Sequence, residues 1–118
     1  MKVPTELVPH CPVCGEEMEM NLRADASFVE DYGWHAAAAH YHDFLSKHQT
    51  GSILYLELGV GMNTPGIIKF PFWKMTAANL QATYACLNKG ETDSPSEISG
   101  QSILIDDDIA SVLQELIH

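Results

Sequence analysis

Three short apolar segments, residues 52–58, 82–87 and 102–105, have the length and composition of β-strands. The first of them, "SILYLEL", is nearly continuous in apolar residues, and Glu57 is its only charged residue. We therefore expect it to be a strand buried on both faces. The segments "ATYACL" and "SILI" predict a second and a third strand. Because helical segments alternate with these strands, the sequence predicts an α/β fold with a parallel sheet.

The helical segments are recognised by their periodicity. Four side chains at helical spacing form a stripe within residues 31–48: Trp34, Ala38, Tyr41 and Leu45. The segment "IIKFPFWKMTAANL" is expected to become helical from about Pro71, because proline is tolerated in a first turn. "DDDIASVLQELI" opens with aspartates that suit an N-cap and continues with apolar residues at helical spacing.

The predicted sheet is thin for a complete domain. The segment 52–58 has the composition of a central strand, yet no segment before it has the pattern of a neighbouring strand. The fold class expected is therefore the C-terminal half of a doubly wound, Rossmann-like sheet, formed by residues 31–118. Residues 1–30 are expected to form a partial zinc-ribbon knuckle and a connecting segment.

The charge balance excludes two classes of partner. Six Lys and Arg stand against 16 Asp and Glu, which gives a formal net charge of -10. Nucleic acids and anionic membranes are bound by clustered Lys and Arg, so neither is expected as a partner. No apolar run approaches the roughly 20 residues of a membrane span. Three cysteines, two of them in one CxxC, fit a reducing compartment, and a cytoplasmic location is expected.

The sequence "HCPVCG" is typical of one zinc knuckle. Cys11 and Cys14 can present two thiolates to one metal ion, because the turn finished by Gly15 sets their spacing. Structural zinc takes four ligands, and the third cysteine, Cys86, lies far along the chain in an apolar segment. Two idle thiols and a redox pair remain as alternatives.

Polar residues follow each predicted strand. "GVGMNTPG", residues 59–66, comes after the first strand, Asn88 ends the second, and Asp106–Asp108 follow the third. Ligands of doubly wound sheets bind at this edge, where glycines let a backbone approach a phosphate or ribose. A plain turn is the alternative for the glycine loop, and helix capping is the alternative for the aspartates.

The ordered set of segments resembles the C-terminal part of a sirtuin. The resemblance rests on "CPVCG", "MNLRADASFVED", "LYLELGVGMNTPGIIKFPFW", "TYACLN" and "SILIDDDIASVLQEL", and it extends from about Val3 to Leu116. It is nearest to the bacterial sirtuins that are encoded beside macrodomain proteins and associated with protein ADP-ribosylation. Sirtuins cleave NAD at its nicotinamide–ribose bond and transfer ADP-ribose to an acyl-lysine oxygen or another acceptor. The resemblance therefore implies an NAD-dependent ADP-ribosyltransferase or deacylase.

The resemblance also implies cofactor-binding residues after the first strand. Gly59, Val60 and Gly61 match the family's cofactor-contacting loop, and Asn63 lies just beyond them. The family has hydroxyl side chains here, and this chain has valine and glycine, so backbone amides would have to make the contacts.

Further matches follow the other strands and the cysteine knuckle. Asn88 matches an asparagine near the adenosine ribose, and Asp106 and Asp107 match the turn beside the adenine. Phe28–Asp31 fall where sirtuins line the acceptor cleft. Val29 replaces a family glycine there, which disfavours ordinary deacylase geometry.

Several sirtuin features have no counterpart in this sequence: the N-terminal phosphate loop, the catalytic histidine and the first cysteine pair. No catalytic residue is therefore assigned. The chain alone is expected to bind NAD weakly or not at all and to be inactive, as a truncated or split protein would be.

The unpaired first strand is expected to find a partner. A second copy, giving a homodimer, or a separately encoded N-terminal half would cover it, and two copies could share one four-cysteine zinc site. If the protein is active, its acceptor is expected to be a protein. Two alternatives remain, a non-catalytic remnant and a small zinc-ribbon interaction module.

Overall fold

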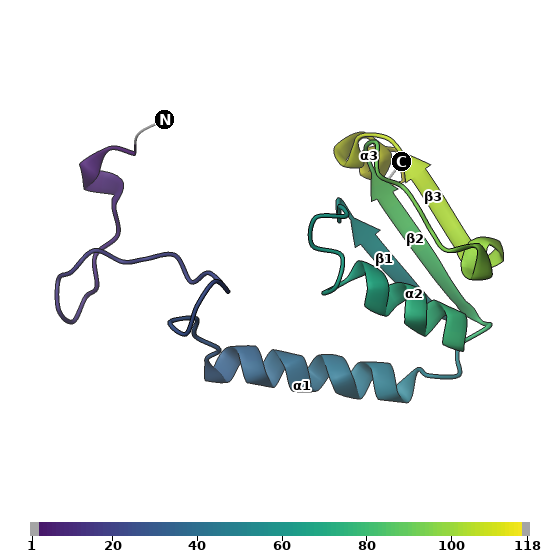
Figure 1. Cartoon of the computed structure of the whole chain (residues 1–118), viewed down its shortest axis with the longest axis horizontal. Helices are drawn as coiled ribbons and strands as arrows, with labels where there is room; N and C mark the ends of the chain where they lie inside the picture. Colours follow the sequence, from purple (N-terminus) through teal and green to yellow (C-terminus); the bar gives the residue numbers. More distant parts are fainter. Residues whose placement is uncertain (1–2, 117–118) are drawn as a thin grey trace. The chain divides into compact units, whose positions relative to one another are not determined.

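The structure, a computed structural model, describes residues 3–116. The first two residues of the predicted segment 1–30 and the last two of the predicted segment 31–118 therefore lie outside the described residues. The elements in chain order are η1 (Thr5–Leu7), α1 (Tyr32–Lys47), β1 (Ile53–Leu58), α2 (Lys69–Ala78), β2 (Ala82–Asn88), η2 (Ser96–Gln101), β3 (Ser102–Asp106) and α3 (Ile109–Leu116) (Figure 1). The chain divides into two compact units, with the boundary inside α1 between Tyr41 and His42. Each unit is described by itself.

The second unit is built on a parallel sheet with the strand order β1-β2-β3. Ile53 is paired with Ala82 and Leu58 with Leu87, while Asn88 is paired with Asp106. The α/β prediction with a parallel sheet is confirmed. The sheet is compatible with half of a Rossmann-like sheet, since its strands are joined by crossover connections that lie outside it.

Helix α2 covers one face of this sheet, and the core lies between them (Figure 1). The side chains of Tyr55 and Tyr84 point into this layer from neighbouring strands, and both are buried. Phe72 and Trp73 of α2 pack on them, with ring centroids 5.1 Å apart for Tyr55–Phe72 and 6.4 Å apart for Trp73–Tyr84. Aromatic pairs of this kind supply much of the buried apolar area of so small a core.

The other face of β1 is exposed, and here one prediction is wrong. Buried and exposed residues alternate along this strand, whereas burial on both faces was expected. Leu54, Leu56 and Leu58 are 57%, 44% and 43% exposed. Strand β2 is buried along nearly its whole length because β1 and β3 flank it, so its predicted burial is confirmed.

The helix ends follow local hydrogen bonding. Asp31 caps α1, since its Oδ1 accepts a hydrogen bond of 2.7 Å from the Trp34 amide, which agrees with the predicted start. Helix α2 begins at Lys69, two residues before the predicted start at Pro71. Pro71 thus lies inside the first turn, where an amide hydrogen would have no intrahelical partner. Part of the predicted polar loop 88–100 is also ordered as η2, which buries Ile98.

The first unit contains the cysteine knuckle. His10 and Glu17 form an antiparallel bridge, and Gly15 between them has a φ of 81°. The Cys11 amide donates to the Glu16 carbonyl at 2.8 Å, and the Gly15 amide donates to the Cys11 carbonyl at 2.9 Å. Within residues 3–116, no helix has the length and apolar character that crossing a bilayer demands.

Candidate functional site

The predicted ligand-binding residues of the second unit meet at the carboxyl ends of the strands. The Gly59 amide donates to the Leu87 carbonyl at 2.9 Å, which ties the start of the glycine loop to the end of β2. The Asp107 amide donates to the Asn88 carbonyl at 3.2 Å, which ties the end of β3 to the same strand. The edge that the sequence predicts as a site is therefore assembled from three connected loops.

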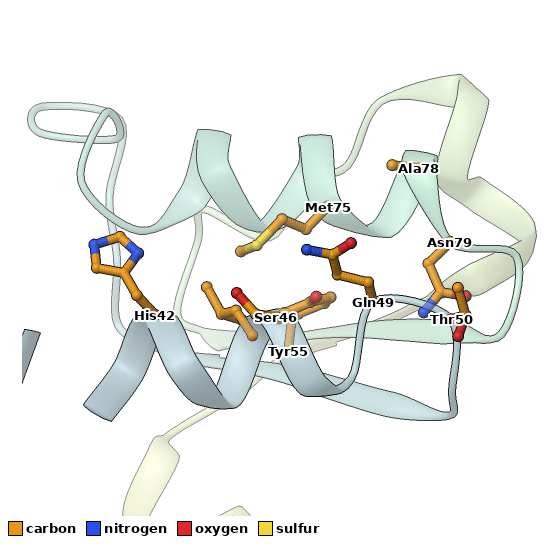
Figure 2. A pocket seen from close by; sticks show the side chains of 9 residues that line it. His42, Ser46, Gln49, Thr50, Tyr55, Met75, Ala78 and Asn79 are labelled. Carbon is orange, nitrogen blue, oxygen red and sulfur yellow. The ribbon is translucent and has the colours of Figure 1, made fainter. Parts of the chain in front are cut away.

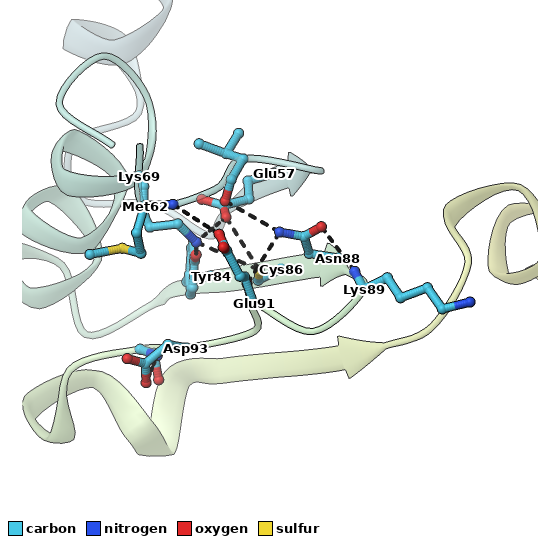
Figure 3. A network of polar contacts seen from close by, with 11 residues as sticks. Glu57, Met62, Lys69, Tyr84, Cys86, Asn88, Lys89, Glu91 and Asp93 are labelled. Atoms are coloured by element: carbon cyan, nitrogen blue, oxygen red, sulfur yellow. Dashed lines mark hydrogen bonds and ion pairs between the residues drawn. The ribbon is translucent and has the colours of Figure 1, made fainter. Parts of the chain in front are cut away.

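The glycine loop has one position whose backbone conformation favours glycine and one at which a side chain from another loop approaches the backbone closely. Gly59 has a φ of 69°, in the left-handed region that other residues rarely adopt. At Gly61, an added Cβ would lie 2.6 Å from Glu91 Oε2 and 3.3 Å from Asn63 Oδ1. The next amide, that of Met62, donates to Glu91 Oε2 at 2.9 Å (Figure 3). The loop thus brings an amide to an anionic oxygen, as a ligand-binding loop would.

Asn88 braces two of the loops. Its Nδ2 donates to the Val60 carbonyl at 3.5 Å and to the Glu91 carbonyl at 3.3 Å, and its Oδ1 accepts from the Lys89 amide at 2.9 Å (Figure 3). A side-chain amide at the end of β2 therefore holds the backbone of both loops in place.

The three aspartates after β3 have different roles. Asp106 Oδ1 accepts from the Gly90 amide at 2.7 Å, so this side chain joins the β2 loop to the β3 loop. Asp107 Oδ1 accepts from the Asp108 amide at 2.7 Å. Asp108 caps α3, because its Oδ1 accepts from the Ser111 amide at 3.0 Å, and this hydrogen bond lowers the pKa of Asp108. The capping alternative is thus confirmed for Asp108.

Sequence reasoning missed two acidic residues of this region. Glu91 lies in a segment that is expected only to be a polar loop, and its contact with Met62 spans 29 residues. Glu57 is noticed only as the one charge of its strand, yet it is 1% exposed and forms an ion pair with the equally buried Lys69. A lone charge in an apolar strand was the available signal, because such a residue requires a buried partner.

A buried polar cluster lies on the α2 face of the sheet, below the loops. Lys69 Nζ is 3.5 Å from the Tyr84 hydroxyl and 3.9 Å from Cys86 Sγ, and Cys86 Sγ donates to Glu57 Oε1 at 3.2 Å (Figure 3). Desolvation raises the pKa of Tyr84 and the pKa of Cys86, so both remain protonated at neutral pH. Cys86 is thus an unreactive thiol, remote in sequence from the cysteine knuckle.

The knuckle contains two cysteines that could each provide a thiolate to a metal ion. The backbone amide of Cys14, together with that of Val13, lowers the pKa of the Cys11 thiol, which favours the thiolate that metals bind. His10 Nδ1 lies 3.1 Å from the Gly15 carbonyl. Within residues 3–116, no three His, Cys, Asp or Glu side chains are grouped so that they could hold a metal ion.

The predicted acceptor segment lies in the first unit and makes local contacts. Val29 exchanges two 2.9 Å hydrogen bonds with the side chain of Asn21. Arg23 forms a 2.7 Å ion pair with Glu30 and lies 4.4 Å from the centroid of the Phe28 ring. These contacts order the segment internally.

A separate groove of about 550 Å³ opens on the α2 side of the second unit (Figure 2). It is lined by Leu45 and Ser46 from the end of α1, by Met75 of α2 and by Tyr55 of β1. Thr50 and Asn79 close it, so it lies toward the amino ends of the strands rather than at the glycine loop.

Two known proteins are similar to this chain. It is 40% identical over 114 residues to a protein ADP-ribosyltransferase of Staphylococcus aureus (strain Mu50 / ATCC 700699), a match over 96% of this chain and 36% of that protein. It is 33% identical over 66 residues to a probable bifunctional ADP-ribose hydrolase/ADP-ribosyltransferase of Fusarium oxysporum f. sp. cubense, a match over 54% of this chain and 11% of that protein. No protein-family model matches.

The chain thus spans about a third of the length of the first of these curated relatives and less of the second. Both names include ADP-ribosyltransferase, which supports an ADP-ribosyltransferase-like family for the matched region.

Proposed function

We propose that this chain is the nucleotide-binding part of a sirtuin-like, NAD-dependent protein ADP-ribosyltransferase. The observation that supports this most directly is the meeting of three loops at the carboxyl edge of the sheet, through the Gly59–Leu87, Met62–Glu91 and Asp107–Asn88 hydrogen bonds. Doubly wound sheets bind nucleotides at this edge. The 40% identity to a protein ADP-ribosyltransferase supports ADP-ribosyl transfer as the reaction in which that nucleotide takes part.

The charges of the edge indicate which part of NAD it would take. Glu91, Asp106 and Asp107 are exposed carboxylates, and Lys89 is the one cation among residues 88–93. Carboxylates accept hydrogen bonds from ribose hydroxyls and repel phosphates. We therefore assign the adenosine ribose and adenine to Asn88, Asp106 and Asp107.

The glycine loop would take the remaining contacts of the cofactor on this chain. Gly59, Val60 and Gly61 offer backbone groups, with Asn63 beside them, and a ligand oxygen could replace Glu91 at the Met62 amide. The diphosphate requires further donors. A second polypeptide segment would supply them, which is why we expect the chain alone to bind NAD weakly or not at all and to release no nicotinamide.

The test is a titration of ¹⁵N-labelled chain with NAD up to millimolar concentration, followed by a mixing experiment. We expect small shifts confined to the amides of residues 59–63, 88–91 and 106–107. Mixing with the part of the Staphylococcus aureus relative that lies outside the matched region should restore nicotinamide release. An absence of both effects would contradict the proposal.

We also propose that the open side of β1 is covered by a second copy of the chain or by a separate N-terminal half. Strand β1 ends the strand order, so its second edge is unpaired within the described residues, and Leu54, Leu56 and Leu58 are exposed beside it. Unpaired edges with apolar side chains promote association. A chain that remains monomeric at micromolar concentration would rule out the homodimer.

Zinc is the second cofactor that we propose, held by Cys11 and Cys14 together with the same pair of another copy. Zinc supplies structural cross-linking of a knuckle when bound. We expect one zinc per two chains in reduced protein. The Cys14→Ser variant should lose it, whereas Cys86→Ala should retain it, since Cys86 is buried in the sheet. Reduced protein without zinc would contradict the shared site.

A further inference from the structure

A buried ion pair joins the two ends of the glycine loop. Glu57 is the penultimate residue of β1, and Lys69 is the first residue of α2. Lys69 Nζ donates to Glu57 Oε1, and the two side chains are 1% and 0% exposed (Figure 3). Between them in the chain lie Leu58, the glycine loop and the two residues Ile67 and Ile68.

A buried pair of charges is weak evidence for a gain in stability. Removing each ion from water costs several kcal/mol, and apolar side chains of similar size often stabilise a core equally well. Glu57 Oε2 also has no hydrogen-bond partner among the described residues, which adds to the desolvation cost. The best-attested use of such pairs is to specify one geometry among several.

The geometry specified here is that of the loop. Glu57 is paired in register with Cys86, and their side chains are in contact on the α2 face. Two residues further along the chain are Gly59, which directly follows β1, and Asn88, the last residue of β2, so the cluster lies one layer below the candidate site. Beyond Glu57, the loop contacts β2 through the Gly59 amide and the Val60 carbonyl, and it contacts the segment after β2 through the Met62 amide.

We propose that Glu57 and Lys69 are a positioning pair that fixes the backbone of residues 59–62 for a nucleotide ligand, without either side chain touching that ligand. The pair sets the distance between the loop ends, so the loop amides need not be ordered when the ligand binds. The statement about the ligand rests on the proposed function, and the statement about the loop does not.

The decisive variant is the double substitution Glu57→Leu with Lys69→Met, which keeps side-chain volume and removes the charges. We expect cooperative unfolding to be retained, while the NMR amide signals of Gly59 and Gly61 shift and gain fast motion. Gly51 and Gly100, which lie outside the loop, should be unchanged. The matched control is Asp43→Ala with Lys47→Ala, which removes an exposed ion pair of α1 and should leave all four glycine signals in place.

A merely structural pair would give a different result. If the double variant folds and its loop glycines retain the wild-type shifts and order, the proposal is overturned. If the double variant does not fold, the Glu57→Gln variant is used, because it keeps the size of the side chain and removes its charge. Shifted and more mobile signals of Gly59 and Gly61 then support the proposal, and wild-type signals overturn it.

Binding of ADP-ribose to the whole chain gives a second readout. Where the wild type shows shifts on titration with ADP-ribose, the folded variant should bind at least about tenfold more weakly, which corresponds to about 1.4 kcal/mol. An unchanged affinity would overturn the ligand part of the proposal. If the wild type itself shows no shifts, the ligand part of the proposal is overturned for the isolated chain, the mixing experiment still tests the proposed function, and the glycine signals still decide whether the pair positions the loop.

Discussion

Gly59 shows how one backbone angle shapes the candidate site. Its φ of 69° lies where a side chain other than glycine costs about 1–2 kcal/mol, and its Cβ position is 3.3 Å from Ile109 Cδ1. We therefore expect Gly59→Ala to lower the free energy of unfolding by about 1–2 kcal/mol in urea titrations. Gly66→Ala is the control, because a Cβ there would meet nothing within 4 Å. Equal losses in both variants would contradict this account.

Asp108 gives a prediction with a pH dependence. Its pKa is lowered from the ordinary value of 3.8 by hydrogen bonds from Ser111, so the folded state favours the carboxylate. The capping contribution is complete above that value and is lost as the pH falls through the lowered folded pKa. Asp108→Ala should therefore lower the Tm at pH 7.

Asp108→Ser tests the same cap without a charge. Serine is a good N-cap, so this variant should have a Tm at pH 7 close to that of the wild type. Because serine does not titrate, the decrease in Tm that Asp108 causes at acidic pH should be absent. Thermal unfolding followed by circular dichroism between pH 7 and pH 3 measures both effects. An alanine variant with an unchanged Tm at pH 7 would show that the cap contributes nothing.

At this scale, the sequence predicts positions better than contacts. It places Gly59, Asn88 and Asp106 at one edge, because strand ends can be recognised from apolar runs. It does not reveal the Met62–Glu91 or Glu57–Lys69 contacts, whose partners are 29 and 12 residues apart. Such contacts depend on how two loops or elements approach each other, which no local pattern encodes.

Among the elements, β1 has the clearest testable property. Leu56 lies in the middle of the exposed leucine face and is 44% exposed. If this face joins two chains, Leu56→Thr should weaken self-association by about tenfold, since an interface loses apolar area and gains a hydroxyl. Its effect on the Tm of the monomer should be small. Sedimentation velocity over a concentration series measures the association.

The control for this experiment is Leu80→Thr. Leu80 is 88% exposed and lies between α2 and β2, outside the sheet. The Leu80→Thr variant should self-associate with the same affinity as the wild type. If both variants associate equally well, the leucine face is not the interface.

The helices and strands themselves could be predicted from periodicity and capping, as α1 and its Asp31 cap show. Burial of β1 could not. The run "ILYLEL" has the same apolar content whether one face or two are covered, and the cases differ only in that no element among residues 42–116 covers the second face. The early start of α2 likewise depends on Lys69, which is fixed by its tertiary partner Glu57.

For the molecule as a whole, charge should control association. Two chains of formal charge -10 repel each other, and salt shortens the range of that repulsion to about 10 Å at 0.1 M. An apolar interface is little weakened by salt. We therefore expect dimerisation to strengthen as NaCl is raised from low to physiological concentration, measured by sedimentation equilibrium. Weaker association at higher salt would indicate an interface held by ion pairs.

The sheet order carries a consequence for how the protein folds. Each strand pairs with the strand nearest to it along the chain, and the order β1-β2-β3 contains no return to an earlier edge. The entropy of loop closure grows only slowly with loop length, so pairing consecutive strands, such as Ile53 with Ala82 at a separation of 29 residues, costs less than pairing strands from opposite ends of the unit. The second unit can therefore grow strand by strand as the chain leaves the ribosome, with β2 closing on β1 and β3 closing on β2. The exposed leucine face of β1 is therefore synthesised first of the three strands and is exposed to other chains for the longest time during synthesis.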